Sequence, residues 1–391
     1  MSTALRAEVM TLLEDAATSY AGAELAPAIS ELRVRFEEPL RVAFAGKVKA
    51  GKSTLLNALI GEELAPTDAG ECTKIVTWYR NSHTYRVTMH PRVGPPRQAP
   101  FNRDDGAIDV ELGGIGADAI DHLEVEWPSQ RLAEVTLIDT PGLASLHDEH
   151  SARTRRFLAI DDDADAGEAD AVIYLMRHLH AADLGFLESF HDDTVARANP
   201  ISTVGVLSRA DEVGACRRDA MTAARRVADR YRRDPRLRRL CQTIVPVAGL
   251  VAEAAATLTE AEYRSLQTLA QTDRAIIDEL LLSVDRMMAE NDDVALTPIE
   301  RQDLLHRLGL YGVRLAVSLI RVGGADTSSQ LVQELRRTSG VEELRALLGG
   351  LFAARRDVLK ARAVLAGLEA MLRTRGDDHA ERLLAELERI T

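Results

Sequence analysis

The chain has little lysine, few aromatic residues and few cysteines. Only five of its 48 basic residues are lysines, and aromatic residues make up 4% of its 391 positions. Because 46% of the residues are nevertheless apolar, the composition favours alanine- and leucine-rich helices over an all-β protein. The three cysteines are widely spaced and form neither a metal-binding pattern nor a disulfide framework, which fits a reducing compartment.

Long apolar runs and a signal sequence are missing as well. No apolar window approaches the ~18 residues that a membrane-spanning helix needs. Residues 1–20 are acidic and amphipathic, and no basic stretch leads into an apolar one, which excludes a signal peptide. We therefore expect a cytoplasmic protein without a transmembrane segment.

Negative charge is in excess, with 48 basic and 61 acidic residues giving a net charge of −13. An acidic chain gains little from a phosphate backbone, so we expect no nucleic-acid partner. Three of the five lysines (Lys47, Lys49 and Lys52) lie within six residues of one another, which points to the loop they occupy.

The length predicts two or three domains, and the hydrophobic pattern divides the chain into three parts. Residues 1–37 are predicted to form N-terminal neck helices, and residues 38–252 alternate strand-like and helical segments, which is typical of an α/β sheet. Within that part, residues 92–116 are rich in Pro, Gly and Asp and are predicted to be loop. Residues 253–391 show only helical periodicity and are predicted to form a helical bundle. Its last helix lacks a clear cap, which suggests a natural protein that continues beyond Thr391.

Residues 46–53, with the sequence Gly-Lys-Val-Lys-Ala-Gly-Lys-Ser, fit the phosphate-loop pattern between a strand and a helix. The glycines let backbone N–H groups curl around phosphates, and the helix N-terminus adds its dipole. Lys52 can reach the β- and γ-phosphates, and Ser53 can place its hydroxyl on Mg²⁺. The nucleotide-binding residues predicted here are Gly46, Lys47, Val48, Lys49, Ala50, Gly51, Lys52, Ser53 and Thr54.

A second motif, Asp139-Thr-Pro-Gly142, follows a predicted strand, at the edge where α/β folds bind their ligands. Asp139 is expected to hold Mg²⁺ through water, and Gly142 to offer its N–H to the γ-phosphate. The same four residues also make a good turn. Their position, 86 residues after Ser53 and behind an apolar strand, favours the functional interpretation.

The third motif, Ser208-Arg-Ala-Asp211, stands after a strand where guanine-specific proteins carry Asn/Thr-Lys-x-Asp. Asp211 would accept hydrogen bonds from the guanine N1–H and exocyclic amine, which adenine cannot supply. Arg209 can lay its stem or its plane along the base, and Ser208 is a weaker substitute for Asn or Thr. Ala248 ends another strand, where its N–H would meet the guanine O6. Four motifs in this order predict a GTP/GDP site with Mg²⁺.

Thr73, 20 residues after Ser53 and just before a strand, is expected to sense the γ-phosphate, with Thr67 and Thr77 as weaker candidates. The predicted metal ligands are therefore Ser53, Thr73 and Asp139. The predicted catalytic residues are Lys52, Thr73, Lys49 and Gly142.

Together these motifs resemble bacterial dynamin-like GTPases, above all the isoniazid-inducible dynamin-like proteins of mycobacteria. The likeness covers roughly residues 40–253. It is carried by residues 51–61 (Gly-Lys-Ser-Thr-Leu-Leu-Asn-Ala-Leu-Ile-Gly), residues 64–66 (Leu-Ala-Pro), Thr73 and residues 245–253. It implies an α/β P-loop GTPase domain with a mixed, mostly parallel sheet and helices on both faces, carried on a helical neck built from both chain ends. It further implies a nucleotide-dependent homodimer, remodelling of a membrane lipid surface at the inner face of the plasma membrane, and an attacking water oriented by Thr73.

The chain departs from eukaryotic dynamins at two loop positions. Val48 replaces a glutamine that helps place the water, and Lys49 replaces a serine that helps hold a monovalent cation. We hypothesise that the Lys49 ammonium substitutes for that cation, although it could equally be a solvated surface lysine.

Other functions remain open at this stage. One alternative is a soluble regulatory GTPase whose helical region binds a protein effector, and an ATPase or kinase is disfavoured by the Asp211 motif. Residues 225–239 carry eight arginines against two aspartates and could meet anionic lipid or simply form the solvated face of a helix.

Overall fold

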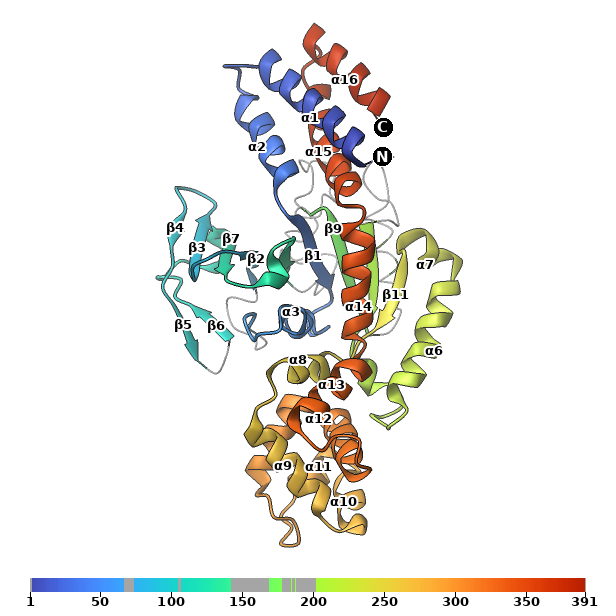
Figure 1. Cartoon of the computed structure of the whole chain (residues 1–391). Helices are drawn as coiled ribbons and strands as arrows, with labels where there is room; N and C mark the ends of the chain where they lie inside the picture. Colours follow the sequence, from blue (N-terminus) through green and yellow to red (C-terminus); the bar gives the residue numbers. More distant parts are fainter. Residues whose placement is uncertain are drawn as a thin grey trace.

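The computed structural model describes residues 2–66, 74–104, 107–141, 169–177, 184, 187 and 202–390. Its centre is a nine-stranded sheet, with helical groups at two opposite ends (Figure 1). The strands of the described residues, of which β5 and β6 form a separate two-stranded sheet, are β1 (Leu40–Gly46), β2 (Val76–Asn81), β3 (Arg86–Pro91), β4 (Arg97–Gln98), β5 (Phe101–Asp104), β6 (Ala107–Val110), β7 (Ile120–Trp127), β8 (Val135–Asp139), β9 (Ala171–Met176), β10 (Thr203–Leu207) and β11 (Thr243–Pro246).

The helices of the described residues precede, separate and follow the strands in the sequence. They are α1 (Ser2–Ser19), α2 (Ala26–Glu37), α3 (Lys52–Ile60), α6 (Ala220–Arg233), α7 (Pro235–Leu240), α8 (Gly249–Thr257), α9 (Glu260–Gln271), α10 (Arg274–Leu280), α11 (Val284–Met288), α12 (Pro298–Arg321), α13 (Ser328–Ser339), α14 (Val341–Leu347), α15 (Arg356–Arg373) and α16 (Asp378–Ile390). Short 3₁₀ turns form η2 (Ala117–Ala119), η3 (Gln130–Leu132) and η5 (Ala210–Glu212), and η6 (Leu348–Ala353) is a π-helical stretch.

The strands lie in the order β11-β10-β9-β1-β8-β2-β7-β3-β4. The first five run parallel to one another, whereas β2 is antiparallel to β8 and parallel to β7. The carboxyl ends of β1, β8, β10 and β11 therefore meet at one edge, which is where the predicted motifs follow each strand. The mixed, mostly parallel sheet that the sequence predicts is confirmed.

Both faces of the sheet are covered, and β1 shows how. Val42 and Phe44 enter a core shared with α3 and α14, whereas Ala43 and Ala45 enter a second core that includes α6. This alternation follows from the two-residue period of a strand. Because neither face meets water, β9 is buried at every position, and its sequence is an unbroken apolar run.

The segment 92–116, which the sequence predicts to be loop, instead contains β4, β5 and β6. β5 and β6 pair antiparallel as a separate two-stranded sheet, with Phe101 opposite Val110. Ile108 and Val110 are buried. The prediction was wrong here because strands of two to four residues are too short to show a clear alternation among so many turn-forming residues.

The C-terminal helices, which the sequence predicts to form one bundle, instead divide between the two ends of the molecule, while α14 packs on the sheet. α15 and α16 pack with α1 and α2 into a neck with its own apolar core (Figure 1). α9 to α12, called the helical insert below, lie at the opposite end, and their core continues into the sheet. The neck from both chain ends that the resemblance implies is thus present.

Local sequence signals set where several of these helices begin. Thr259 caps α9 together with Glu262 in a reciprocal capping box, and Thr297 with Glu300 caps α12 in the same way. In each box the threonine hydroxyl and the glutamate three residues later satisfy backbone N–H groups that the helix leaves free. Pro298 then fits the first turn of α12, where no N–H is required.

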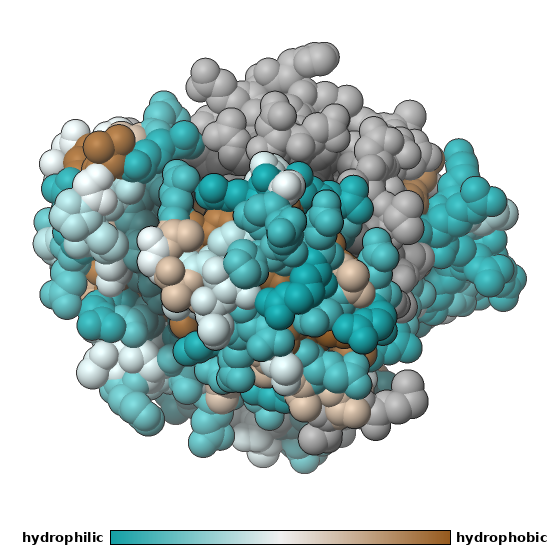
Figure 2. Space-filling model, turned by 90° about the horizontal axis from the view of Figure 1, so that it is seen from above, coloured by the Kyte–Doolittle hydropathy of each residue, from teal (hydrophilic) through white to brown (hydrophobic). Residues whose placement is uncertain are grey.

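None of the helices that the structure describes is long and apolar enough to cross a membrane. Seen from the neck end, the coloured surface is mainly hydrophilic, and its apolar residues lie in separate patches (Figure 2). The apolar faces of the neck helices are turned into their shared core.

Candidate functional site

The phosphate loop connects the end of β1 to the start of α3. Gly46 has φ 151°, and a Cβ there would lie 2.6 Å from the Leu175 carbonyl oxygen. Gly51 has φ 88° at the N-cap of α3, a conformation that glycine adopts without strain. Lys49 also has a positive φ, 62°. The loop is therefore a tight turn that leads directly into a helix N-terminus, the geometry suited to a phosphate.

Lys52 is held inside this turn. Its side chain is 8% exposed, and its Nζ lies 3.5 Å from the Gly46 carbonyl oxygen. Burial lowers the pKa of the Lys52 ammonium, and the nearby Asp139 carboxylate opposes that shift. Lys52 is thus a largely desolvated ammonium at a helix N-terminus. A bound phosphate would stabilise it by replacing the solvation that it has lost.

Asp139 and Ser53 meet beside the loop. The Ser53 hydroxyl donates to Asp139 Oδ2 at 2.8 Å, while the buried Oδ1 has no hydrogen-bond partner among the described residues. Burial raises the pKa of Asp139, and Lys52 and the Ser53 hydroxyl oppose this rise. A carboxylate with an unused oxygen beside a hydroxyl suits Mg²⁺, which prefers oxygen ligands. Ser53 and Asp139 therefore fit Mg²⁺. Two further predicted site residues, Thr73 and Gly142, lie outside the described residues.

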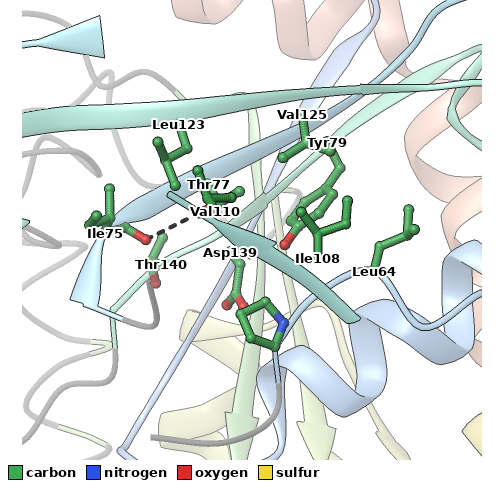
Figure 3. A pocket seen from close by; sticks show the side chains of 11 residues that line it. Leu64, Ile75, Thr77, Tyr79, Ile108, Val110, Leu123, Val125, Asp139 and Thr140 are labelled. Carbon is green, nitrogen blue, oxygen red and sulfur yellow. Dashed lines mark hydrogen bonds between the residues drawn. The ribbon is translucent and has the colours of Figure 1, made fainter. Parts of the chain in front are cut away.

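An apolar pocket borders the same carboxylate (Figure 3). It contains about 400 Å³ of space, part of it open to solvent, and Leu64, Ile75 and Leu123 are among its lining residues. Thr140 donates its hydroxyl to the Phe44 carbonyl at 2.6 Å, which fixes the end of β8 against β1. Few polar neighbours surround Asp139 on this side, and this is consistent with its raised pKa.

The guanine motif opens onto the other end of the phosphate loop. One pocket of about 530 Å³, partly open to solvent, is lined by Gly51 and Thr54 together with Ser208, Arg209 and Asp211. Residues more than 150 positions apart in the sequence therefore share one cavity. This is the arrangement expected if a nucleotide spans from the loop to Asp211.

Burial raises the pKa of Asp211 to about 6. Arg209 has φ 49°, and its guanidinium donates to the Glu212 carboxylate at 2.8 Å. The Ser208 hydroxyl oxygen is buried and has no hydrogen-bond partner in the part of the chain that is described. A buried carboxylate and an unused hydroxyl in a pocket are groups that a polar base could satisfy.

The expected contact of Ala248 is not available in this structure. Its N–H donates to the Ser339 carbonyl at 2.9 Å, so it is not free to meet a guanine O6. The cause is tertiary, because α13 ends against the strand end that carries Ala248. Val48 and Lys49, in contrast, lie exposed in the phosphate loop, and Val48 is 52% exposed.

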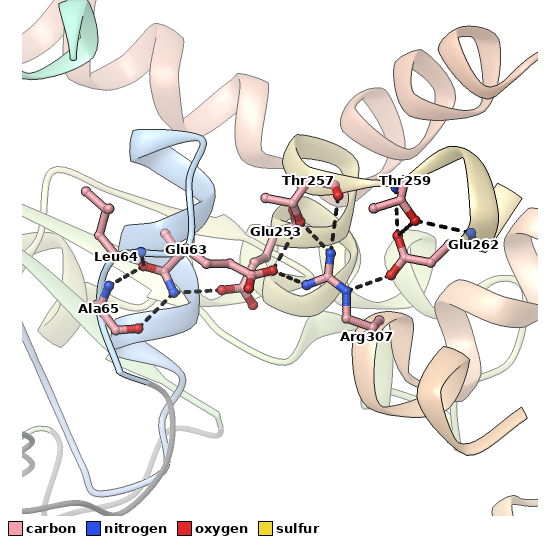
Figure 4. Close-up of polar contacts among 9 residues, drawn as sticks. Glu63, Leu64, Ala65, Glu253, Thr257, Thr259, Glu262 and Arg307 are labelled. Atoms are coloured by element: carbon pink, nitrogen blue, oxygen red, sulfur yellow. Dashed lines mark hydrogen bonds and ion pairs between the residues drawn. The ribbon is translucent and has the colours of Figure 1, made fainter. Parts of the chain in front are cut away.

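A polar network that the sequence did not reveal extends from α3 to the helical insert (Figure 4). Asn57 donates to Glu253 at 2.8 Å and to the Ala65 carbonyl at 3.0 Å, and its own oxygen accepts the N–H groups of Leu64 and Ala65. Burial raises the pKa of Glu253 to about 7. A possible signal was present, since Glu253 is the only charged residue of α8 and Asn57 stands within an otherwise apolar stretch.

The fold and the site together define a P-loop guanine-nucleotide-binding protein. Residues 42–207 match the dynamin family. The chain is 39% identical over 346 residues to the isoniazid-induced protein IniC of Mycobacterium tuberculosis, which covers 88% of this chain and 69% of that protein. It is also 30% identical over 165 residues to a bacterial dynamin-like protein of Nostoc punctiforme, covering 38% and 22% of the two chains. The chain therefore belongs to the bacterial dynamin-like GTPases, as the sequence motifs predict.

A solved structure of an oligomerised bacterial dynamin pair aligns with a TM-score of 0.37 and 13% identity. It covers 100% of this chain and 62% of the other, so this chain spans less than two thirds of that protein.

Proposed function

We propose that the chain binds GTP across the pocket between the phosphate loop and Asp211, and hydrolyses it. The observation that carries the proposal is the shared cavity, with Asp211 at one end and Lys52, Ser53 and Asp139 gathered beyond the other. Lys52 would bind the β- and γ-phosphates, and Asp211 would accept from the guanine. Ser53 and Asp139 would hold Mg²⁺, which neutralises charge on the phosphates when bound. Thr73 would orient the attacking water, and the Gly142 N–H would bind the γ-phosphate.

Dimerisation in the GTP state is part of the proposal. Val48 cannot hydrogen-bond to a water, and both Val48 and Lys49 are exposed, so a second copy facing the loop could complete the site. Turnover per molecule should then rise with protein concentration, and a flat profile argues against dimerisation.

We further propose that the Lys49 ammonium takes the place of a monovalent cation. Replacing K⁺ by a large inert cation should leave GTP turnover unchanged, and a strong dependence of turnover on K⁺ would contradict this proposal.

Membrane remodelling is proposed because the chain belongs to the dynamin-like family and because α6 presents a basic face. Arg226, Arg230 and Arg233 are exposed at helical spacing and have no acidic partner in the part of the chain that is described. Arg232 is different, since it pairs with Asp229 and Glu343. Juxtaposed arginines on one helix face repel each other, and anionic headgroups would relieve that repulsion.

The alternative is a regulatory GTPase whose helical region binds a protein effector. It is favoured by one observation: the helical insert shares its core with the nucleotide-binding domain, so an effector on the insert could sense the nucleotide.

The deciding experiment measures GTP turnover over a range of protein concentrations, with and without liposomes containing phosphatidylserine, using Lys52→Ala as the blank. Stimulation with co-sedimentation supports membrane remodelling, and Arg226→Glu with Arg230→Glu should abolish it without lowering lipid-free turnover. Turnover that ignores lipid favours the regulatory GTPase. No turnover above the Lys52→Ala blank contradicts the proposed activity.

A further inference from the structure

Helix α12 of the insert is broken at a single residue next to the guanine motif. Gly309 has φ 67° and ψ 167°, a combination that only glycine adopts readily, within an otherwise continuous helix. A Cβ at Gly309 would lie 3.4 Å from the Leu250 side chain and 4.0 Å from Asp211 Oδ2. Leu250 and Asp211 both line the predicted base pocket, so the kink brings α12 against the nucleotide site.

Arg307, two residues before the kink, connects α12 to the chain that directly follows α3. Its Nε donates to Glu262 at 2.8 Å, its Nη2 donates to the Thr257 hydroxyl at 2.6 Å, and its Nη1 contacts Glu63 (Figure 4). Glu63 directly precedes Leu64, and the Leu64 N–H donates to the Asn57 side-chain oxygen. The planar guanidinium thus joins three elements at once, because its donors are spread over three nitrogens, whereas an ammonium has its three donors on a single nitrogen.

Arg314, five residues after the kink, connects α12 to the loop that follows the guanine motif. Its Nη1 donates to the carbonyls of Ala215 and Cys216 at 3.1 and 2.6 Å. Both residues have positive φ angles, 61° and 57°, which cost free energy in residues other than glycine. Nε and Nη2 of Arg314 donate to carbonyls of the insert itself, Leu281 and Leu282. The arginine therefore holds a strained loop, three residues beyond η5, in place against the insert.

We propose that Arg307 and Arg314 are positioning residues for GTP turnover that act at opposite ends of the nucleotide. Arg307 positions the chain that directly follows α3, at Glu63, and Arg314 positions the guanine-binding loop. Neither side chain lines the predicted base pocket, so each acts through backbone or through Glu63. The inference rests on the proposed function, because it assumes that the phosphate loop leading into α3 and the Asp211 motif bind GTP.

The two arginines are expected to affect different kinetic steps. Arg307→Ala should lower the single-turnover hydrolysis rate at saturating GTP about tenfold, with the Kd for a fluorescent GDP analogue unchanged within about twofold, because the base site is intact. Arg314→Ala should speed dissociation of the same GDP analogue about tenfold and leave the single-turnover hydrolysis rate unchanged.

Matched variants separate positioning from folding. Arg321→Ala removes an arginine of the same helix whose Nη1 donates to the Thr272 carbonyl at 2.8 Å, and it should change neither step. Glu63→Gln should reproduce the effect of Arg307→Ala on hydrolysis. Arg307→Lys retains the charge but not the three-way contact, so it should recover only part of the rate. These two milder variants keep the test decisive if an alanine variant fails to fold.

The crossed pattern supports the proposal. Equal effects of Arg307→Ala and Arg314→Ala on both steps, or values matching those of Arg321→Ala, overturn it. If the wild-type chain itself neither binds the GDP analogue nor hydrolyses GTP, the proposed function has failed. If the wild type turns over normally and the arginine variants match the control, only the positioning role has failed.

Discussion

The neck and the helical insert are both α-helical, yet they are joined to the sheet in different ways. The apolar cluster of the neck is made by helices α1, α2, α15 and α16 and the turn after α1, and of α15 only Leu359 enters the core of the sheet instead. Those of the insert, such as Leu304 and Leu308, belong to one core with Ala43 and Tyr174 of the sheet. Rotating the neck therefore disturbs the core of the sheet mainly at Leu359 of α15, whereas displacing the insert opens a core that is extensively shared. The neck is suited to move as a rigid body, and the insert is suited to respond to conformational changes in the sheet.

The neck meets the sheet at a buried charge cluster. Asp170, which directly precedes β9, accepts from the Arg41 N–H at 2.9 Å, and lies 3.1 Å from Lys360 Nζ and 3.3 Å from Arg35 Nη2. Lys360 comes from α15 and Arg35 from α2, so the Asp170 carboxylate holds two of the four neck helices. Burial lowers the pKa of the Lys360 ammonium, and Asp170 opposes that shift.

The largest effect is expected at that cluster. Asp170→Asn leaves the fully buried Lys360 without its counter-charge, which should cost about 3–5 kcal/mol of unfolding free energy. Calorimetry should show an early neck transition, while GDP binding survives because the nucleotide site lies in the sheet. Asp229→Asn removes an exposed ion pair with Arg232 and should cost below about 1 kcal/mol. A single transition that also removes GDP binding would contradict the independence of the neck.

A pair of core truncations tests the comparison directly. Leu368 in the neck and Leu308 in the insert are both 0% exposed, so either leucine-to-alanine change should cost about 2–5 kcal/mol. Leu308→Ala should also weaken GDP binding, because Leu308 adjoins the kink beside Asp211, whereas Leu368→Ala should not. If both variants fold and bind GDP with equal affinity, the core shared by the insert and the sheet does not influence the nucleotide site.

The insert side should show a pH dependence through Glu253. Its pKa is about 7 when folded and ordinarily 4.5, so the stability it contributes is fully present below pH 4.5 and is lost as pH rises through 7. That loss amounts to on the order of 3 kcal/mol. Urea unfolding of Glu253→Gln between pH 5 and 8 should show a flatter profile and higher stability than the wild type at pH 8. An unchanged slope would mean that Glu253 does not titrate in this window.

The smallest effect concerns guanine binding. Because Asp211 has a pKa of about 6 and must be ionised to accept two hydrogen bonds, GDP affinity should fall as pH drops below 6. The expected loss is about tenfold, or 1.4 kcal/mol, per pH unit, measurable by titration calorimetry. Asp211→Asn should bind GDP weakly at every pH, whereas Leu368→Ala in the neck should keep the wild-type profile. A flat wild-type profile would argue against Asp211 as the guanine acceptor.

Local chemistry explains which features of the site could be anticipated from the sequence. The phosphate loop follows from glycines that permit a tight turn between a strand and a helix, and the structure has that turn at Gly46 and Gly51. The pairing of Ser53 with Asp139 follows from motifs at the ends of neighbouring parallel strands. Contacts made by distant helices could not be read in this way, such as the bond of Ala248 to Ser339 or of Arg307 to Glu63.

By itself, the sequence determined the nucleotide-binding chemistry, the order of its motifs and the helical character of both chain ends. These depend on backbone conformation and periodicity within short segments. Only the tertiary structure decided that α15 joins the neck while α12 joins the sheet and kinks at Gly309 beside Asp211. The reason is physical: amphipathic helices with similar apolar faces differ only in the surface that covers them, and that surface is supplied by residues far away in the chain.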